Sequence, residues 1–293
     1  MPSEKDKYPL LALPKSVTRI SSFPLVQQGN QLRKNALSAA RSVDLINWNG
    51  TPYGDHPKQV VDMQEVNDLC PRDGWPTVLL IHGGSWTHGN KEYFKALMPL
   101  FTRKRIMPVA MNYRLAPDHQ WPAQIEDVHL AIDFLKQQQV DLKRIALWGV
   151  SAGGHLALTA ALQRDDICAV VTFGAPTDIE TMSKAEWQAY FSEEDLAEAS
   201  PLQMKTAQLP PILMLHGELD QVVPISNCTR FLEKYPSVQS IILKNGNHGL
   251  HWPPLKARQV KKQAFDWLVE TMDLPKVGSK WKRSKKKKSK KKS

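Results

Sequence analysis

Short apolar runs alternate along the chain with longer segments whose apolar residues recur every three or four positions. The run Thr77–His82 (TVLLIH) is short, rich in branched side chains and without polar alternation, which is typical of a strand buried on both faces of a sheet. Similar runs occur at Arg105–Tyr113, Arg144–Trp148, Ala169–Phe173, Pro211–His216 and Ser240–Leu243. These runs predict a mostly parallel central sheet with helices on both faces.

Helical patterns fill the intervals between these strands. In Pro122–Gln138 the apolar residues recur at steps of three and four, which places them on one face of a helix. Lys91–Lys104 and Leu255–Thr271 are also expected to be helical. Because strands that alternate with such helices form β-α-β units, the sequence predicts an α/β fold.

Composition divides the chain into three parts. Residues 1–40 contain scattered prolines, serines and glutamines and predict an irregular N-terminal arm. Residues 41–275 carry the alternating strands and helices and predict one domain, which is long enough for a full core. Within it, residues 177–210 exceed the length of a tight connection, and we interpret them as a small lid, with one crossover helix as the alternative. Residues 276–293 are of low complexity and predict a disordered polybasic tail.

The formal net charge of +10 is concentrated in that tail. Residues 276–293 hold 11 lysines and arginines and no acid, whereas the rest of the chain has 28 basic and 29 acidic residues. The body is therefore nearly neutral, which argues against a basic, nucleic-acid-binding fold. The tail itself is interpreted as a contact for import machinery, nucleic acid or anionic lipid, with a solvated tail lacking any specific partner as the alternative.

The sequence lacks the marks of a membrane-spanning or secreted protein. No run approaches the ~18 consecutive apolar residues of a transmembrane helix, and the first residues make a poor secretory signal. Cys70, Cys168 and Cys228 are odd in number and widely spaced, which argues against a disulfide framework or a structural zinc site. We expect an intracellular, cytoplasmic protein with no metal or organic cofactor, and the C-terminal lysines leave a nuclear location as the alternative.

Two glycine motifs suggest covalent catalysis. The segment Gly149–Gly153 (GVSAG) fits G-x-S-x-G between a predicted strand and a predicted helix, where Ser151 would sit on a sharp turn with its hydroxyl exposed. The alternative to a catalytic role for this segment is a glycine-rich turn between strand and helix that serves packing alone. His82–Trp86 (HGGSW) directly follows a predicted strand, and backbone N–H groups of such a loop are suited to stabilising an oxyanion. The second motif therefore favours the catalytic interpretation of the first.

A serine nucleophile needs a base, and the base needs an acid that orients it. Asp220 follows the predicted strand Pro211–His216, and His248 follows the last predicted strand. Both would lie at the carboxyl edge of the sheet, where ligands bind in parallel sheets. Glu218 is the alternative to Asp220, and His251 is the alternative to His248.

At these residues the sequence resembles the α/β-hydrolase superfamily, and within it the esterase and lipase group with an HGG oxyanion loop. The resemblance is carried by IHGGSWTHGNKEYF, MNYRLAPDHQWPAQIEDVHLAIDFL, LWGVSAGGHLA, SPLQMKTAQLPPILMLHGELDQVVP and NGNHG, in family order. It implies an α/β-hydrolase fold with Ser151 as nucleophile, Asp220 as orienting acid and His248 as base. It also implies an oxyanion hole built from the backbone N–H groups of Gly83, Gly84 and Ala152.

The resemblance implies a serine hydrolase that cleaves a small neutral carboxylic ester through an acyl-enzyme on Ser151. The HGGSW form is also similar to kynurenine formamidase-like members, so an arylformamidase acting on an N-formyl amide with the same triad is one alternative. A non-catalytic hydrolase-fold protein, tethered by its basic tail to nucleic acid or an anionic membrane, is another. Trp86, beside the oxyanion loop, and Trp252, four residues after His248, are candidate walls of the substrate pocket, with packing as the alternative. The oligomeric state cannot be read from the sequence.

Overall fold

The computed structural model describes residues 50–68, 70–182, 188, 190–206, 208–249 and 254–274. All of them belong to the second of two compact units, Leu45–Ser293, and the first unit is Met1–Asp44. The predictions made for residues 1–40 and 276–293, for His251 and for Trp252 lie outside the described residues.

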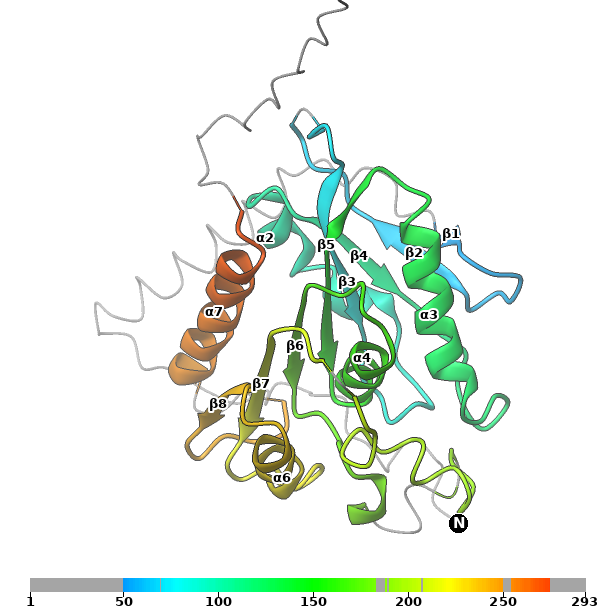
Figure 1. Ribbon diagram of the computed structural model, residues 1–293, viewed down its shortest axis with the longest axis vertical. Helices are drawn as coiled ribbons and strands as arrows, with labels where there is room; N and C mark the ends of the chain where they lie inside the picture. Colours follow the sequence, from blue (N-terminus) through cyan, green and yellow to red (C-terminus); the bar gives the residue numbers. More distant parts are fainter. Residues whose placement is uncertain are drawn as a thin grey trace, which may run out of the picture. The chain divides into compact units, whose positions relative to one another are not determined.

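An eight-stranded sheet forms the centre of the second unit, in the order β1-β2-β4-β3-β5-β6-β7-β8 (Figure 1). Strands β3 to β8 pair in parallel, whereas β1 pairs with β2, and β2 with β4, in antiparallel fashion. This mostly parallel sheet confirms the predicted α/β class. The strands are β1 (Thr51–Pro52), β2 (Val60–Met63), β3 (Trp75–Ile81), β4 (Met107–Met111), β5 (Val140–Val150), β6 (Ala169–Phe173), β7 (Ile212–Gly217) and β8 (Gln239–Leu243).

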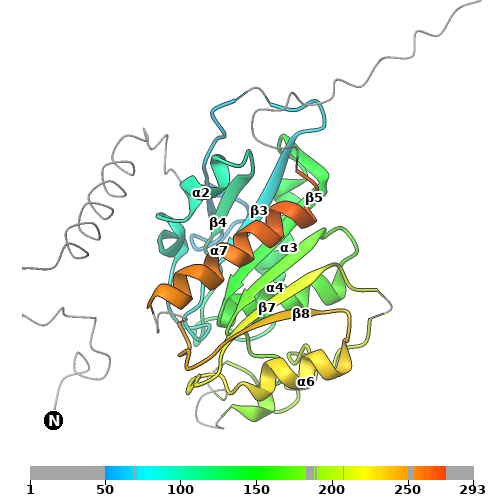
Figure 2. The same ribbon diagram turned by 90° about the vertical axis from the view of Figure 1, so that its left-hand side faces the viewer.

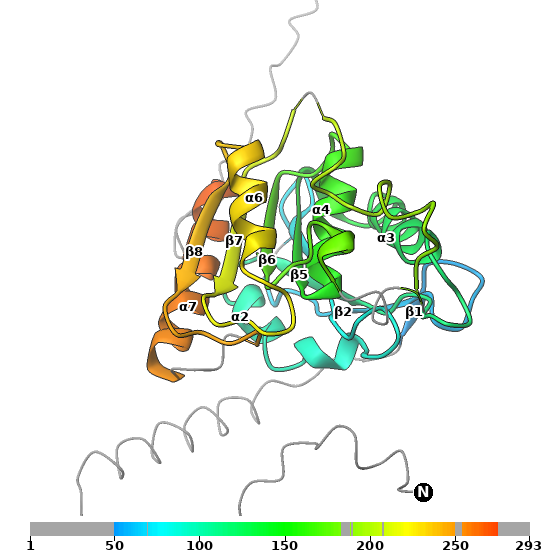
Figure 3. The same cartoon turned by 90° about the horizontal axis from the view of Figure 1, so that it is seen from below.

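Helices cover both faces of this sheet (Figures 2 and 3). One face is covered by α3 (Ala123–Leu135), α4 (Ala152–Gln163) and α6 (Ser226–Lys234). The other face is covered by α2 (Met98–Thr102) and α7 (Pro254–Thr271). None of the helices in the described part of the chain is long and apolar enough to cross a membrane.

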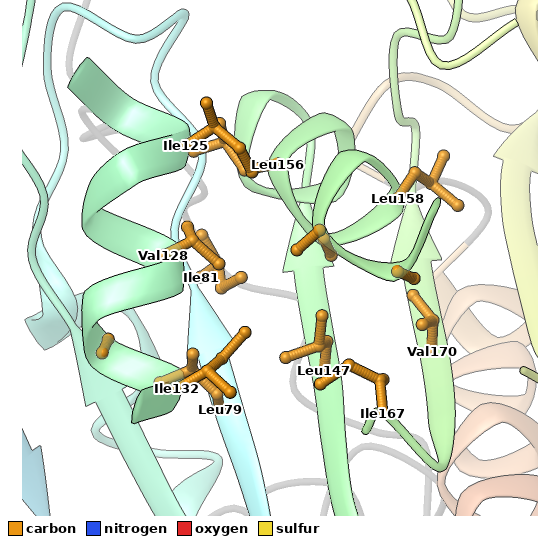
Figure 4. Close-up of a cluster of buried hydrophobic side chains, with 14 of the residues drawn as sticks. Leu79, Ile81, Ile125, Val128, Ile132, Leu147, Leu156, Leu158, Ile167 and Val170 are labelled. Carbon is orange, nitrogen blue, oxygen red and sulfur yellow. The ribbon is translucent and has the colours of Figure 1, made fainter. Parts of the chain in front are cut away.

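Each strand contributes to two cores because successive side chains point to opposite faces of the sheet. In β3, Leu79 and Ile81 lie in the core beneath α3 and α4, whereas Val78 and Leu80 lie in the core beneath α2 and α7. Figure 4 shows the first core, where Val128 of α3 and other branched side chains meet those of β3. Each fully buried side chain of this size contributes about 1.5–3 kcal/mol, so the cores hold the strand ends and the loops that follow them.

The segment Lys91–Lys104 differs from its prediction as one continuous helix. The structure has a 3-10 turn, η2 (Lys91–Phe94), and the separate short helix α2. Pro99 stands at the beginning of α2, where its missing N–H leaves no bond unmade. A proline inside a longer helix would remove a backbone hydrogen bond and clash with the preceding turn, so the two pieces remain separate.

The predicted lid, residues 177–210, is described except for residues 183–187, 189 and 207. Its described residues form the 3-10 turn η3 (Ile179–Thr181) and a series of turns. The carbonyl of Tyr190 accepts the N–H of Trp121, and the N–H of Leu202 donates to the carbonyl of Thr177. This part of the segment is therefore tied to the domain by backbone hydrogen bonds.

Candidate active site

Ser151 occupies the turn that joins β5 to α4. Its φ of 53° and ψ of −122° are values that a residue with a side chain rarely adopts. Its N–H donates to the carbonyl of Phe173 at 2.7 Å, which fixes the turn on the neighbouring strand. A Cβ atom on Gly149 would lie 2.2 Å from the carbonyl oxygen of Gly153, so the flanking glycines permit the close approach of strand and helix.

The side chains of Ser151, His248 and Asp220 form one hydrogen-bonded chain. The Nε2 atom of His248 lies 2.9 Å from Oγ of Ser151, and its Nδ1 atom lies 2.7 Å from Oδ2 of Asp220. The three residues follow β5, β8 and β7, so the chain assembles at the carboxyl edge of the sheet. With Nδ1–H donating to the carboxylate, Nε2 is free to accept the serine proton.

The carboxylate of Asp220 is held on both oxygens. Its Oδ1 atom accepts the N–H groups of Val222 and Val223, each at 2.9 Å. The Nε2 atom of His216 donates to the carbonyl of Val223 at 2.8 Å and lies 3.4 Å from Oδ2 of Asp220. Burial raises the pKa of the Asp220 carboxyl, but hydrogen bonds from His216, His248 and the backbone outweigh burial and hold this pKa well below its usual range. Asp220 is thus a carboxylate at neutral pH and can orient and stabilise His248.

Glu218, the alternative acid, is turned away from this chain. It is exposed, and its Oε2 atom accepts the N–H of Asn245 at 2.9 Å. Its carboxylate therefore stabilises the loop that follows β8, and the geometry favours Asp220 as the partner of His248.

The loop after β3 passes close to Ser151. A Cβ atom on Gly83 would lie 3.1 Å from Cβ of Ser151, so there is no room for a side chain between the two residues. Gly84 has a φ of +120°, which favours glycine, and the loop turns there. Outside the sheet ladders, no hydrogen bond among the described residues uses the N–H of Gly83, Gly84 or Ala152. Ala152 also opens α4, where the first N–H groups have no partner within the helix.

His82 fixes the same loop from the core. Its ring stacks on Tyr113 with 4.3 Å between centroids, and the Tyr113 hydroxyl donates to the His82 carbonyl at 2.9 Å. Burial lowers the pKa of His82 to about 4, so the ring is neutral near pH 7. Its Nδ1 atom lies 2.8 Å from the carbonyl oxygen of Gly83 and can donate to it. The ring thereby stabilises the loop.

Trp86 lies in the core, which favours packing, the alternative to its prediction as a pocket wall. Its side chain is 1% exposed and packs edge-on against Phe191. Its Nε1–H donates to Nδ1 of His155 at 3.2 Å, and Nε2 of His155 donates to the carbonyl of Ala199 at 2.6 Å. Burial lowers the pKa of His155 to about 4, and the neutral ring satisfies both bonds with one tautomer. The indole points inward because its partners, distant in sequence, lie in α4 and in residues 190–206.

Sequence reasoning missed one histidine that supports the site, His216. It is the last-but-one residue of β7, so the available signal was its closeness to Asp220. Among the described residues, no group of three or more histidines, cysteines or acids is arranged to hold a metal ion.

Comparison with known sequences relates the chain to esterases. Residues 70–235, more than half of the chain, match the profile of the family described as BD-FAE. Esterase LipC of Mycobacterium tuberculosis is 29% identical over 219 residues, which cover 64% of this chain and 54% of LipC. Arylacetamide deacetylase of Bos taurus is 36% identical over 156 residues, which cover 50% of this chain and 34% of the deacetylase. The chain thus spans about half the length of LipC and a third of the deacetylase.

Comparison with solved structures relates the fold to the same group. Esterase 2 of Thermogutta terrifontis superposes with a TM-score of 0.68 at 20% identity, covering 80% of this chain and 96% of the esterase. A truncated carbohydrate esterase from gut microbiota superposes with a TM-score of 0.66 at 20% identity, covering 79% of this chain and 99% of that one. At this identity the likeness concerns the fold, and it confirms the α/β-hydrolase fold expected from the sequence.

Proposed function

Because the chain belongs to the BD-FAE family and has an α/β-hydrolase fold, we propose that it is a serine hydrolase of small neutral carboxylic esters. The observation that carries this proposal is the hydrogen-bonded chain from Ser151 through His248 to Asp220. The esterase names of LipC and of the structural neighbours support the ester as substrate. A neighbouring structure is phosphonylated by sarin, and we expect organophosphonates to label this chain at Ser151.

Acylation begins when Oγ of Ser151 attacks the ester carbonyl. Nε2 of His248, 2.9 Å away, takes the serine proton. The positive charge that develops on the ring faces the ionised Asp220, which keeps Nδ1 protonated and the ring in the reactive orientation. His248 then gives its proton to the leaving alcohol, and an acyl-enzyme on Ser151 remains.

The negative charge of the tetrahedral intermediate needs donors in fixed positions. We assign this role to the backbone N–H groups of Gly83, Gly84 and Ala152. The closeness of the Gly83 loop to Ser151 and the place of Ala152 at the start of α4 support the assignment. One donor of this kind contributes about 2.7–4 kcal/mol to transition-state stabilisation. Water then attacks the acyl-enzyme with His248 as the base, and the carboxylic acid is released.

An aryl amide is the second candidate substrate, and it uses the same residues. Arylacetamide deacetylase of Bos taurus, among the relatives, is named for an amide, which supports testing amides beside esters. An N-formyl amide differs from an ester in its leaving group, an amine that His248 must protonate. Substrate preference therefore separates the two candidates, while the triad does not.

A paired assay tests the proposal. We compare wild type with Ser151→Ala and with the control Ser240→Ala, which replaces an exposed serine of β8. The substrates are p-nitrophenyl acetate, butyrate and octanoate, and N-formylkynurenine. We expect Ser240→Ala to match wild type and Ser151→Ala to lose turnover on every substrate. The ratio of ester to formamide turnover identifies the preferred substrate. A folded wild type that is inert on all of them and unlabelled by a fluorophosphonate would favour a non-catalytic binding protein.

We further propose, from sequence alone, a cytoplasmic location and a polyanionic partner for residues 276–293. The 11 cations of that segment, without an acid, support the partner. Salt-sensitive binding to RNA or to anionic vesicles that disappears on deletion of residues 276–293 tests it.

A further inference from the structure

A groove of about 970 Å³ lies between α2 and α7, on the face of the sheet opposite α4. Figure 2 shows these two helices on the same side of the strands. Trp148 of β5 and Phe173 of β6 lie at its floor, and Leu97 and Phe265 line its sides. The volume is at the upper end of the roughly 300–1,000 Å³ typical of ligand sites. The proposed hydrolysis requires no groove on this face.

The floor of the groove and part of its rim are apolar. At the floor, Trp148 is 3% exposed and Phe173 is 6% exposed. At the rim, Tyr93, Leu100 and Leu255 are 58%, 42% and 83% exposed. Large apolar side chains that remain in contact with water mark a binding surface, because covering them is favourable.

Unpaired cations surround this apolar surface. Asp266 is the acid of the groove lining, and it pairs with Lys262. No ion pair in the described part of the chain engages the other cations of the lining, which are Arg103, Lys104, Arg258 and Lys261. Lys261 is half-buried, and burial lowers the pKa of its ammonium group. An anion bound among these side chains would offset the cost of removing their charges from water.

The groove reaches towards the candidate active site at one end. Val150 and Gly249 belong to its lining, and they are the chain neighbours of Ser151 and His248. The alkyl chain of a ligand can therefore extend along the floor while its charged group lies among the cations that follow α2 and those of α7.

We propose that this groove binds a single-chain amphipathic anion, namely a long-chain carboxylate. The apolar floor accommodates the alkyl chain. The cations that follow α2, Arg103 and Lys104, and those of α7 bind the carboxylate. A bilayer would meet the rim residues alone, whereas the depth of the groove down to Trp148 favours one inserted chain. The proposal goes beyond ester hydrolysis, because binding requires neither Ser151 nor His248.

The test is calorimetric titration of the full chain with monomeric laurate, beside butyrate and dodecyltrimethylammonium. We expect saturable one-to-one binding of laurate, at least about tenfold tighter than that of either comparison compound. Leu100→Asp and Arg258→Glu should each weaken laurate binding by at least about tenfold. If circular dichroism shows that Arg258→Glu is unfolded, Lys104→Glu takes its place. The control Lys143→Glu replaces an exposed cation of β5 that lies outside the groove lining, and it should bind laurate as wild type does.

Two further arms can overturn the proposal. Protein labelled at Ser151 by a fluorophosphonate should still bind laurate. Loss of binding would mean that the alkyl chain of laurate occupies the active site. Binding to phosphatidylglycerol vesicles without binding to monomeric laurate would identify a membrane-facing surface instead. If the fluorophosphonate does not label the protein but laurate still binds, the proposed hydrolase activity is contradicted and the proposed laurate-binding groove is supported.

Discussion

The Nδ1 atom of His248 lies 2.7 Å from Oδ2 of Asp220, although 28 positions separate the two residues in the sequence. The loops after β7 and β8 bring them together, and the same histidine reaches Ser151 with its other nitrogen. The ionised carboxylate selects the tautomer in which Nε2 accepts a proton. The reactivity of Ser151 therefore depends on a residue that does not touch it.

Replacement of the carboxylate by an amide tests this dependence. In Asp220→Asn the shape of the site is retained, but the amide does not stabilise the cationic ring or fix its tautomer. We expect kcat on p-nitrophenyl butyrate to fall by about 10³–10⁴-fold with little change in KM. Glu218→Gln is the matched control, since that carboxylate accepts the N–H of Asn245 and should leave kcat within a few fold. Similar losses in both variants would refute the assignment of Asp220.

The closeness of Gly83 to Ser151 predicts a transition-state defect when a side chain is added at Gly83. A Cβ atom at this position would lie 2.8 Å from the carbonyl oxygen of Val150 and would push the loop away from Ser151. Gly83→Ala should lower kcat by about 10²–10³-fold, the loss expected for one oxyanion donor. Gly50→Ala, at an exposed position before β1, is the control for glycine replacement. Wild-type kcat in folded Gly83→Ala would exclude this loop from the oxyanion hole.

The hydrogen bond from Trp86 to His155 predicts a difference between two tryptophans. Both Trp86 and Trp121 pack against His155 and Phe191, but the buried Nε1 atom of Trp121 has no hydrogen-bond partner among the described residues. Trp86→Phe should lower the free energy of unfolding by about 1–3 kcal/mol more than Trp121→Phe, because it leaves a buried acceptor on His155 unpaired. Urea unfolding of both variants measures this difference. Equal losses would mean that the bond contributes nothing.

Burial of His155 predicts how stability depends on pH. Its folded pKa is lowered from 6.5 to about 4, so between these values the unfolded chain binds a proton that the folded chain does not. Stability should therefore fall as the pH falls through this window, by up to about 1.4 kcal/mol per pH unit for this one residue, and His155 should contribute no slope above it. Urea titrations of wild type and His155→Gln at several pH values check this. An unchanged slope in the variant would show that folding does not lower the pKa of His155.

The parallel strands could be predicted because their apolar runs are buried on both faces, and the pattern does not depend on distant partners. The antiparallel strands β1 and β2 were not predicted, since they are short and β2 contains Asp62. Helix α6 was also missed, because its nine residues include only two buried apolar side chains, Cys228 and Phe231. The helix predicted across Pro99 failed at the proline itself.

The predicted site residues lie together because each one follows a strand, and parallel strands end at the same edge. The direction in which a side chain points was harder to predict from the sequence. Trp86 stands next to the oxyanion loop in sequence, yet contacts with His155 and Phe191 turn it into the core. Because such contacts join segments that are far apart in the chain, no local sequence pattern predicts them.

The most direct measurement is the intact mass of the protein during turnover of p-nitrophenyl butyrate, with peptide mapping of any adduct. Wild type, quenched in acid within the burst, should carry one butyryl group on Ser151, and Ser151→Ala should carry none. An adduct on another residue, or turnover in Ser151→Ala equal to that of wild type, would contradict the account.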